Sequence, residues 1–403
     1  MSTITNDPIL LNSTLQSFSN QIKTQNEYLS MIVSTHKAAV YDSVSQIAHI
    51  VRSNDLAMNK KLFPIGDQII IPWKDMDDSS HNTDDTAYQV AWNIVDHRMV
   101  TLKDGSSVPG LVIQMHKCSA YGVQFSHEQA VYHASSAMTA GTYCFTVNSA
   151  FGNVPANSIL EFTTTKTLPA DGRIYVDTSK SVQLYEKDGT SPLETVTASI
   201  VTSSSGTNLG TTGSNGLNTI NNIRYGHNRY STSAIRQYLN ATGTGWWKSQ
   251  EDFDIRPDEY AKNGFMTGFN DDFLSAIKPV KITTALNTVE GYSNATEDTY
   301  DTFFLPSLEE MNATPQLSGA EGSYFPYWRS RLGVDKLVGW YSSNTYDGYK
   351  IPAINSNSAQ HVLLRSAYRP YSYYAWYVHT SGCIYDTNIT YNAIRFSPVC
   401  VIC

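Results

Sequence analysis

Apolar residues recur at three- and four-residue intervals through the first fifty positions of the chain. The positions are Leu11, Leu15, Phe18, Ile22, Leu29, Ile32, Val40, Val44, Ile47 and Val51. This spacing predicts one long amphipathic helix that begins after Asp7-Pro8. Polar Gln25 and His36 lie between the apolar positions, as register-setting residues do in helical bundles. We therefore expect a parallel bundle of several chains, and the alternative is a helix folded back on its own domain.

From Leu62 the pattern changes to short, β-branched segments bounded by turns. The segments FPIGDQIIIPW, YQVAWNIVDHRMVTL and GLVIQMHKCS are of strand type. Four more, AGTYCFTV, ILEFTTTK, PADGRIYV and SVQLYEK, lie between about Met138 and Ile200. Their regular spacing predicts a small β-sandwich, which the Gly/Ser/Thr-rich stretch SSSGTNLGTTGSNG then closes.

After about Leu217 the pattern mixes loops and short strands with two predicted helices, Ser231 to Asn240 and Asp271 to Ile277. Aromatic residues are frequent here. We expect the tryptophans to pack these loops onto a compact core; they are Trp246, Trp247, Trp328, Trp340 and Trp376.

Composition narrows the class of protein. Only 16% of the residues are charged and the net charge is -8, so no basic surface for nucleic acid is expected. No apolar run approaches the roughly 20 residues of a membrane span, and the start lacks the features of a signal peptide. The five cysteines form no CxxC pair of the zinc-ribbon type and leave one unpaired in any disulfide scheme, so they are expected to be mostly buried thiols of a protein made in a reducing cytoplasm.

The sequence offers little catalytic chemistry. No HExxH, GxSxG, Walker-type or GxGxxG motif occurs, so we expect neither an enzyme nor a metal or other cofactor. The acidic loop from Asp75 to Asp85 has no regular ligand spacing and is expected to be solvated. The adjacent pairs Asp271-Asp272 and Glu309-Glu310 cannot face each other as glycoside hydrolysis requires, which favours helix-cap and surface roles. His97, His116 and His227 are expected to be hydrogen-bonded structural histidines.

The last forty residues are crowded with tyrosine among Ser, Asn, Thr and His. Tyrosine offers a large, stiff contact surface at low entropic cost, and the small polar residues supply adaptable hydrogen bonds. This composition is typical of a binding surface. A tyrosine-rich sheet without a ligand is the alternative.

An ordered series of motifs resembles a family of phages and gut bacteria whose members carry a C-type-lectin-like domain related to the formylglycine-generating fold. The motifs are IGDQI, RYGHNRYSTSAIRQYLN with the following WW, FLSAIKPVKITT, DTFFLPSLEEM, YWRSR, LLRSAY, YYAWYV and RFSPVCVI. They cover most of residues 61 to 135 and 217 to 403. The reactive cysteine motif of the formylglycine-generating enzymes is not recognisable here, so the resemblance does not extend to that oxidation.

Several members of this family are targets of diversity-generating retroelements, which rewrite a C-terminal variable repeat. The resemblance implies that Leu364, Arg365, Ala375, Trp376, Val378, Gly382, Arg395, Phe396 and Pro398 are scaffold. It also implies that variable, ligand-facing positions are Tyr368, Arg369, Tyr371, Tyr373, His379, Ser381, Tyr385, Thr387 and Ile389.

The fold class expected from these observations is α+β, a C-type-lectin-like domain with an inserted small β-sandwich and a long N-terminal helix. The expected segments are an oligomerisation and attachment segment at 1–60, the lectin-like domain at 61–135 and 206–403 with its variable region at about 328–403, and the insertion at 136–205.

The function expected from the resemblance is that of an adhesin at a phage tail tip or fibre. Its partners would be a host-cell surface protein or glycan, other tail proteins bound through the N-terminal segment, and two further copies in a homotrimer, without nucleic acid or membrane insertion. It would be made in the host cytoplasm and reside in the virion. The alternatives are a structural decoration protein of the virion and an enzyme acting on glycans.

Overall fold

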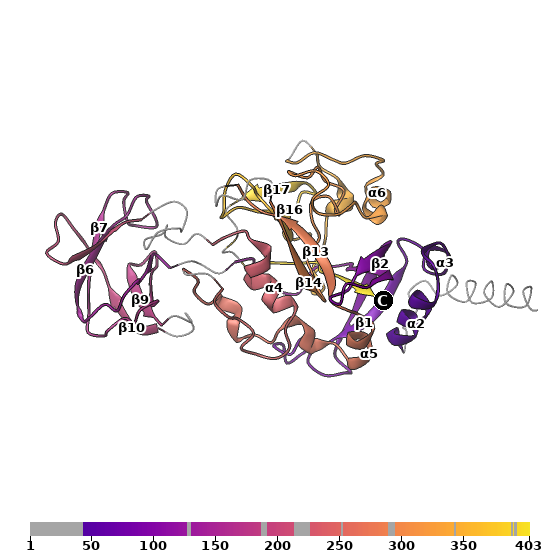
Figure 1. The fold of residues 1–403 in the computed structure, drawn as a ribbon, viewed down its shortest axis with the longest axis horizontal. Coiled ribbons are helices and arrows are strands. Elements are labelled where there is room, and N and C mark those ends of the chain that lie inside the picture. The colour runs from indigo at the N-terminus through magenta and orange to yellow at the C-terminus, as the bar shows by residue number, and fades with distance from the viewer. Residues whose placement is uncertain are drawn as a thin grey trace, which may run out of the picture.

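The computed structural model describes residues 43–126, 130–186, 192–212, 226–250, 253–288, 295–341, 344–387, 390 and 393–403. These residues form a body and a smaller lobe beside it, as Figure 1 shows. The smaller part, here the insertion lobe, spans residues 130–212. Each part has a hydrophobic core of its own.

A four-stranded antiparallel sheet is the centre of the body. Its strands, in spatial order, are β1 (Gln68–Trp73), β2 (Tyr88–Thr101), β3 (Ser107–Met115) and β19 (Val399–Ile402). Apolar residues alternate inward along β1, and Trp92 of β2 is completely buried among phenylalanines of the facing helices and loops. Because β19 pairs with β3, the last residues of the chain complete the sheet that the first strands begin.

Two short helices precede this sheet, α2 (Val44–Ser53) and α3 (Leu56–Leu62). Val44, Ile47 and Val51 of α2 are buried in the body's own core. The chain is extended at Asn54, and Asp55 then caps α3 through a hydrogen bond from the main-chain N–H of Met58. The described end of the expected long helix is therefore folded back on its own domain. The remainder of that expected helix, residues 1–42, lies outside the described residues.

The rest of the body consists of short elements joined by loops. Ser233 and Asn270 cap α4 and α5 by accepting hydrogen bonds from main-chain N–H groups. The helices are α4 (Ala234–Leu239), α5 (Asp271–Ala276), α6 (Pro326–Leu332) and the 3-10 turns Tyr230–Thr232, Asp258–Ala261, Phe265–Gly268 and Asp347–Tyr349. The strands are β4 (Val123–Gln124), β13 (Val280–Ala285), β14 (Thr296–Asp301), β15 (Val362–Ala367), β16 (Ala375–Val378), β17 (Ile384–Thr387) and β18 (Ala393–Ile394).

Two four-stranded sheets build the insertion lobe. Residues of both sheets, such as Phe145 and Leu184, share one core, so the lobe is a sandwich that includes the expected insertion at 136–205. Phe253 and Ile255 of the body pack against Ala130, Tyr175 and Tyr185 at its base. The sheet orders are β10-β9-β8-β5 and β11-β7-β6-β12. Their strands are β5 (Tyr132–His133), β6 (Gly141–Thr146), β7 (Ile159–Thr164), β8 (Arg173–Val176), β9 (Ser181–Tyr185), β10 (Pro192–Thr197), β11 (Ser199–Val201) and β12 (Thr207–Thr211).

The expected α+β, C-type-lectin-like class with a long N-terminal helix is wrong for the described chain. Strand makes up 35% of it and helix 15%, and the strands lie in several small, separate sheets. The physical reason is segment length: the longest described α-helix has 10 residues, and most apolar residues lie in short runs that end at turns.

One expectation from composition agrees with the structure. All five cysteines are buried free thiols. Across the described ranges, we find no helix with both the length and the apolar character needed to cross a membrane.

Candidate binding surface

A three-stranded antiparallel sheet of β15, β16 and β17 carries the tyrosine-rich end of the chain. Every residue of β15 and β16 is buried, which makes this sheet a rigid base. Apart from buried Tyr377 of β16, the described tyrosines of this segment are on the loops that leave the sheet and on its edge strand β17. Side chains at such positions are held by the scaffold while remaining accessible.

Tyr341, Tyr371 and Tyr385 project from this base, with exposed fractions of 40%, 46% and 39%. The rings of Tyr371 and Tyr368 stack with centroids 5.8 Å apart, and those of Tyr341 and Tyr385 meet edge to face at 5.4 Å. Half-buried Tyr374 packs against both members of the stacked pair. We call the set Tyr341, Tyr368, Tyr371, Tyr374 and Tyr385 the aromatic surface.

Trp376 of β16 lies beneath the aromatic surface and is completely buried. Its ring is 5.4 Å from that of Tyr368, 6.3 Å from that of Tyr341 and 4.9 Å from that of Trp340. Aromatic packing at these separations restricts ring motion, so the exposed tyrosines are ordered before any ligand arrives.

One buried asparagine shapes the turn that carries Tyr368, Tyr371 and Tyr374. The side-chain nitrogen of Asn228 lies 3.0, 2.8 and 2.9 Å from the main-chain oxygens of these three residues. Its side-chain oxygen accepts a hydrogen bond from Asn287. Asn228 is fully buried, so these contacts are shielded from water.

Tyr341 has a strained backbone, with φ of 70° in the left-handed region. Its main-chain N–H donates to Ile384 of β17, and its hydroxyl is hydrogen-bonded to the carboxylate of Asp386 and to Tyr368. Burial raises the pKa of Asp386, and the hydrogen bond from Tyr341 partly offsets this rise. These contacts connect Tyr341 and the residues just before it to the edge strand β17.

The turn after β16 adds polar groups beside the tyrosines. The Nδ1 atom of His379 accepts a hydrogen bond from the main-chain N–H of Ser381 at 3.0 Å, and the Ser381 hydroxyl is 2.8 Å from the same atom. The rings of His379 and His361 have centroids 4.7 Å apart, and His379 also faces Tyr385. Burial and the neighbouring His379 lower the pKa of His361.

The structure separates the expected ligand-facing positions into groups. Tyr371, Ser381 and Tyr385 are exposed, while Tyr368, Tyr373 and His379 are half-buried. Arg369 differs, because its side chain is buried and its Nε donates to the main-chain oxygen of Leu286 at 3.0 Å. In this structure the side chain of Arg369, one of the expected ligand-facing positions, supports the loop from inside. The side chain of Thr387 and the whole of Ile389 lie outside the described residues.

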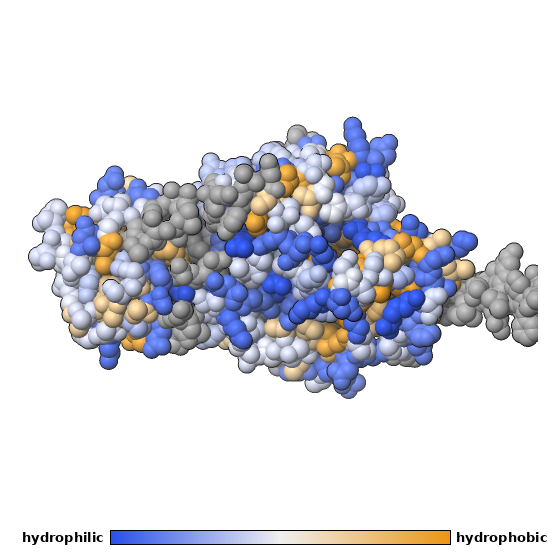
Figure 2. Space-filling view, in the orientation of Figure 1, coloured by the Kyte–Doolittle hydropathy of each residue, from blue (hydrophilic) through white to orange (hydrophobic). Residues whose placement is uncertain are grey.

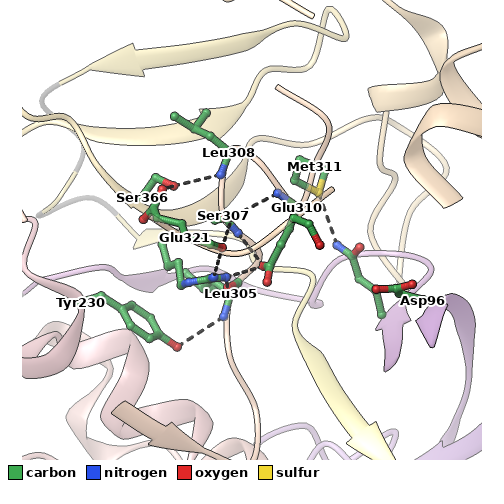
Figure 3. Close-up of polar contacts among 12 residues, drawn as sticks. Asp96, Tyr230, Leu305, Ser307, Leu308, Glu310, Met311, Glu321 and Ser366 are labelled. Carbon is green, nitrogen blue, oxygen red and sulfur yellow. Dashed lines mark hydrogen bonds and ion pairs between the residues drawn. The ribbon is translucent and has the colours of Figure 1, made fainter. Parts of the chain in front are cut away.

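A buried polar network anchors β15 to the segment 305–321, as Figure 3 shows. Arg365 forms an ion pair with Glu310 and also donates to the main-chain oxygens of Leu305 and Glu321, at 2.8 and 3.1 Å. The neighbouring Ser366 donates to the Glu321 carboxylate at 2.5 Å. Glu310 was expected to have a helix-cap or surface role; it is buried, and it makes a cap-type pair with Ser307, in which each main-chain N–H donates to the other residue's side chain. The network fixes the strand from which Tyr368 emerges.

Three residues of this site were not among the predicted positions, and of these only Tyr374 lies within the closing tyrosine-rich segment. Tyr341 lies outside the closing tyrosine-rich segment, and Asn228 is 140 residues from Tyr368 in sequence. The only sequence signal for Asn228 was its position in RYGHNRY, one of the motifs that carry the resemblance. The motif does not indicate which groups the asparagine side chain bonds.

The other candidate groups have structural roles. Asp272 accepts hydrogen bonds from Ser43 and from the first main-chain N–H groups of α2, so it acts as a cap. His97 bonds to the main-chain oxygen of Phe63 at 2.7 Å, and His116 to Asn93 at 3.1 Å. Within the described ranges, no cluster of three or more His, Cys, Asp or Glu side chains is arranged to hold a metal ion.

On the face seen in Figure 2, hydrophobic residues occur in small separate groups among hydrophilic ones. Of the six large hydrophobic side chains that are exposed in the described residues, three belong to the aromatic surface. The concentration of exposed aromatic area at one place distinguishes this site from the rest of the described surface.

Comparison with known proteins adds one similarity. Residues 205–402 match a family model described as a domain of unknown function, DUF6273. No curated protein and no solved structure matches the chain. The matched segment begins at the end of the insertion lobe and includes the whole aromatic surface.

Proposed function

We propose that this chain is a receptor-binding protein of a phage virion, which attaches to a host-cell surface through the aromatic surface. The observation that carries the proposal is the set of exposed tyrosines held on a fully buried base. Tyrosine and tryptophan dominate the energetic centres of binding interfaces, because they bury much area at small entropic cost.

Among the described residues, few charged side chains lie at the aromatic surface. Arg369 is buried beneath it, and Asp386 is 9% exposed and bonded to Tyr341. Recognition would therefore depend on ring contacts and on hydrogen bonds from hydroxyl groups rather than on ion pairs. Such binding is expected to be insensitive to salt.

The assignment to a virion depends on the ordered motifs that resemble phage variable proteins. The same resemblance supports the proposal that several positions around the aromatic surface vary between related chains. We further propose that residues 1–42 join three copies, because multiple weak sites on one particle then add by avidity. A virion decoration protein without a receptor remains the competing function.

The test is attachment of the purified, fluorescently labelled full-length chain to intact cells of the bacterium whose genome, or whose phage, carries the gene. The double variant Tyr371→Ser, Tyr385→Ser should lose attachment and keep its melting temperature. Ile200→Ser is the matched control, because Ile200 is 44% exposed on the insertion lobe. Attachment that survives the double variant but is lost in the control would place the receptor site on that lobe. A wild-type chain that attaches to none of these cells would favour the decoration role.

A further inference from the structure

A cleft of about 210 Å³ opens in the body, away from the tyrosines, between β2, β13 and the segment before α6. Apolar side chains form much of its wall, and charged groups lie at its base. The lining residues that matter here are Arg98, Val100, Lys281, Ile282, Phe304 and Glu310. We call it the Arg98 cleft.

Two polar atoms of this cleft, Nη1 of Arg98 and Oε1 of Glu310, face each other without a hydrogen bond between them. The Nε of Arg98 donates to Asp96 at 2.5 Å and its Nη2 to the main-chain oxygen of Ser323 at 3.1 Å. Its Nη1 is left 4.0 Å from the Oε1 of Glu310, too far for a hydrogen bond. Oε2 of Glu310 accepts from Arg365 and from the main-chain N–H of Ser307. No hydrogen bond within the described part of the chain reaches Nη1 or Oε1.

Gly322 shows that there is room for an atom beside both of these groups. A carbon atom added at its Cβ position would lie 3.5 Å from Glu310 Oε1 and 3.7 Å from Arg98 Nη1, and would meet nothing else within 4 Å. The Arg98 guanidinium is fixed in place by the ring of Phe325, 4.9 Å away. The donor and the acceptor are thus held apart at a spacing that one small polar group fills.

Each cation that lines the cleft already has a carboxylate partner, and the remaining lining carboxylate, Glu321, is buried and accepts hydrogen bonds from Ser366 and from the main-chain N–H of Ala285. Arg98 is paired with Asp96, Arg365 with Glu310, and Lys281 with Asp298 at 2.7 Å. A charged ligand would gain no free counter-ion here and would lose its hydration, which is costly. The cleft therefore favours an uncharged ligand.

We propose that the Arg98 cleft binds a single neutral sugar ring, a hexose. One hydroxyl group can donate to Glu310 Oε1 and accept from Arg98 Nη1 at the same time, which an amide nitrogen or a carbonyl cannot do. The faces of a pyranose are apolar and fit walls such as Val100 and Ile282. The volume is below the roughly 300–1,000 Å³ of pockets for drug-sized ligands, so the site suits one ring rather than an extended oligosaccharide. This site does not depend on the aromatic surface or its proposed function.

Saturation-transfer NMR on the full-length chain tests the proposal, with glucose, galactose, mannose and N-acetylglucosamine as neutral probes and glucuronic acid as the charged one. Gly322→Ala places a methyl group 3.5 and 3.7 Å from the two polar atoms, in the space that a bridging hydroxyl group would use, and should abolish the signal. Gly319→Ala is the matched control. Both glycines have a positive φ, 70° at Gly319 and 97° at Gly322, so alanine strains the backbone at either position, but a Cβ at 319 meets nothing within 4 Å. Arg98→Lys removes Nη1 and should weaken binding about tenfold, the effect of one lost hydrogen bond.

Saturable binding of a neutral hexose by the wild type and by Gly319→Ala, with loss in Gly322→Ala, supports the site. If Gly322→Ala does not fold, a roughly tenfold weaker binding of the hexose by Arg98→Lys supports the site instead. Absence of any neutral hexose signal at tens of millimolar would overturn the proposal and mean that only water fills the gap. A preference for glucuronic acid, or binding unchanged in both cleft variants, would overturn it as well.

Discussion

The side-chain nitrogen of Asn228 lies 2.8 Å from the main-chain oxygen of Tyr371, although 143 residues separate them in sequence. The same nitrogen reaches the main-chain oxygens of Tyr368 and Tyr374. An amide carries two N–H donors, so three acceptors share them. One buried side chain thereby sets the shape of the loop that presents the tyrosines.

Replacing Asn228 should therefore distort the aromatic surface, although none of its tyrosines is changed. Asn228→Ala leaves buried carbonyl groups unsatisfied, at a cost of about 1–3 kcal/mol in the free energy of unfolding. Asn228→Asp should cost more, because its carboxylate would face three carbonyl oxygens. Urea denaturation measures the change in the free energy of unfolding, and the cell-attachment assay measures the damage to the aromatic surface. An Asn228→Ala variant that equals the wild type in both would show that the loop keeps its shape by other contacts.

Truncating exposed aromatic residues of this site should change the free energy of unfolding little, and truncating a buried one should lower it strongly. Tyr371→Ser and Tyr385→Ser should each change the free energy of unfolding by no more than about 0.5 kcal/mol. Trp376→Ala removes a completely buried ring and should cost about 3–5 kcal/mol. Thermal and urea unfolding of the three variants make the comparison. A large destabilisation by Tyr371→Ser would mean that the tyrosines are structural rather than available to a ligand.

The sequence predicted the local elements of this protein better than their assembly. Segments such as QIIIPW and SVQLY are short runs bounded by turns, and they form β1 and β9 as expected. The predicted helices at 231–240 and 271–277 contain α4 and α5. The class assignment was wrong because it relied on a helical pattern whose described end, α2, is short and packs on its own core.

Long-range polar contacts could not be predicted. Arg365 and Glu310 are 55 residues apart, and each alone has the pattern of a surface charge. Only the fold brings them together in a buried pair. In the same way, Arg369 occurs among tyrosines that suggest a binding loop, yet its side chain points into the protein to bond Leu286.

Breaking the Glu310–Arg365 pair should be among the most costly changes in the body. Arg365→Met leaves the Glu310 carboxylate buried without its counter-ion, and such losses cost about 3–5 kcal/mol. Adding Glu310→Leu to that variant should recover part of the loss, because the buried charge of Glu310 is then removed as well. A double-mutant cycle from urea denaturation gives the coupling free energy. A coupling near zero would contradict a cooperative network.

Deletion of the N-terminal residues should separate oligomerisation from folding. A chain of residues 43–403 keeps α2 and its buried Val44, Ile47 and Val51, so its melting temperature should match that of the full chain. If residues 1–42 join the proposed trimer, sedimentation velocity should show a trimer for the full chain and a monomer for the shorter one. Deletion of 1–55 removes α2 and should lower the melting temperature. A full-length chain that sediments as a monomer would disprove the trimer.

Acidification should destabilise the region around His361. Burial and the nearby His379 lower the pKa of His361 below the usual 6.5, so the folded state binds a proton there less readily than the unfolded state does. The stability that neutral His361 contributes is therefore complete above pH about 6.5 and is lost as the pH falls toward the lowered value. Relative to the wild type, His361→Gln should lose less stability between pH 7 and pH 5, as measured by urea unfolding. His379→Gln is the second arm, because removing that neighbour should raise the pKa of His361 in an NMR titration. An unchanged pKa in this variant would mean that burial alone sets the titration of His361.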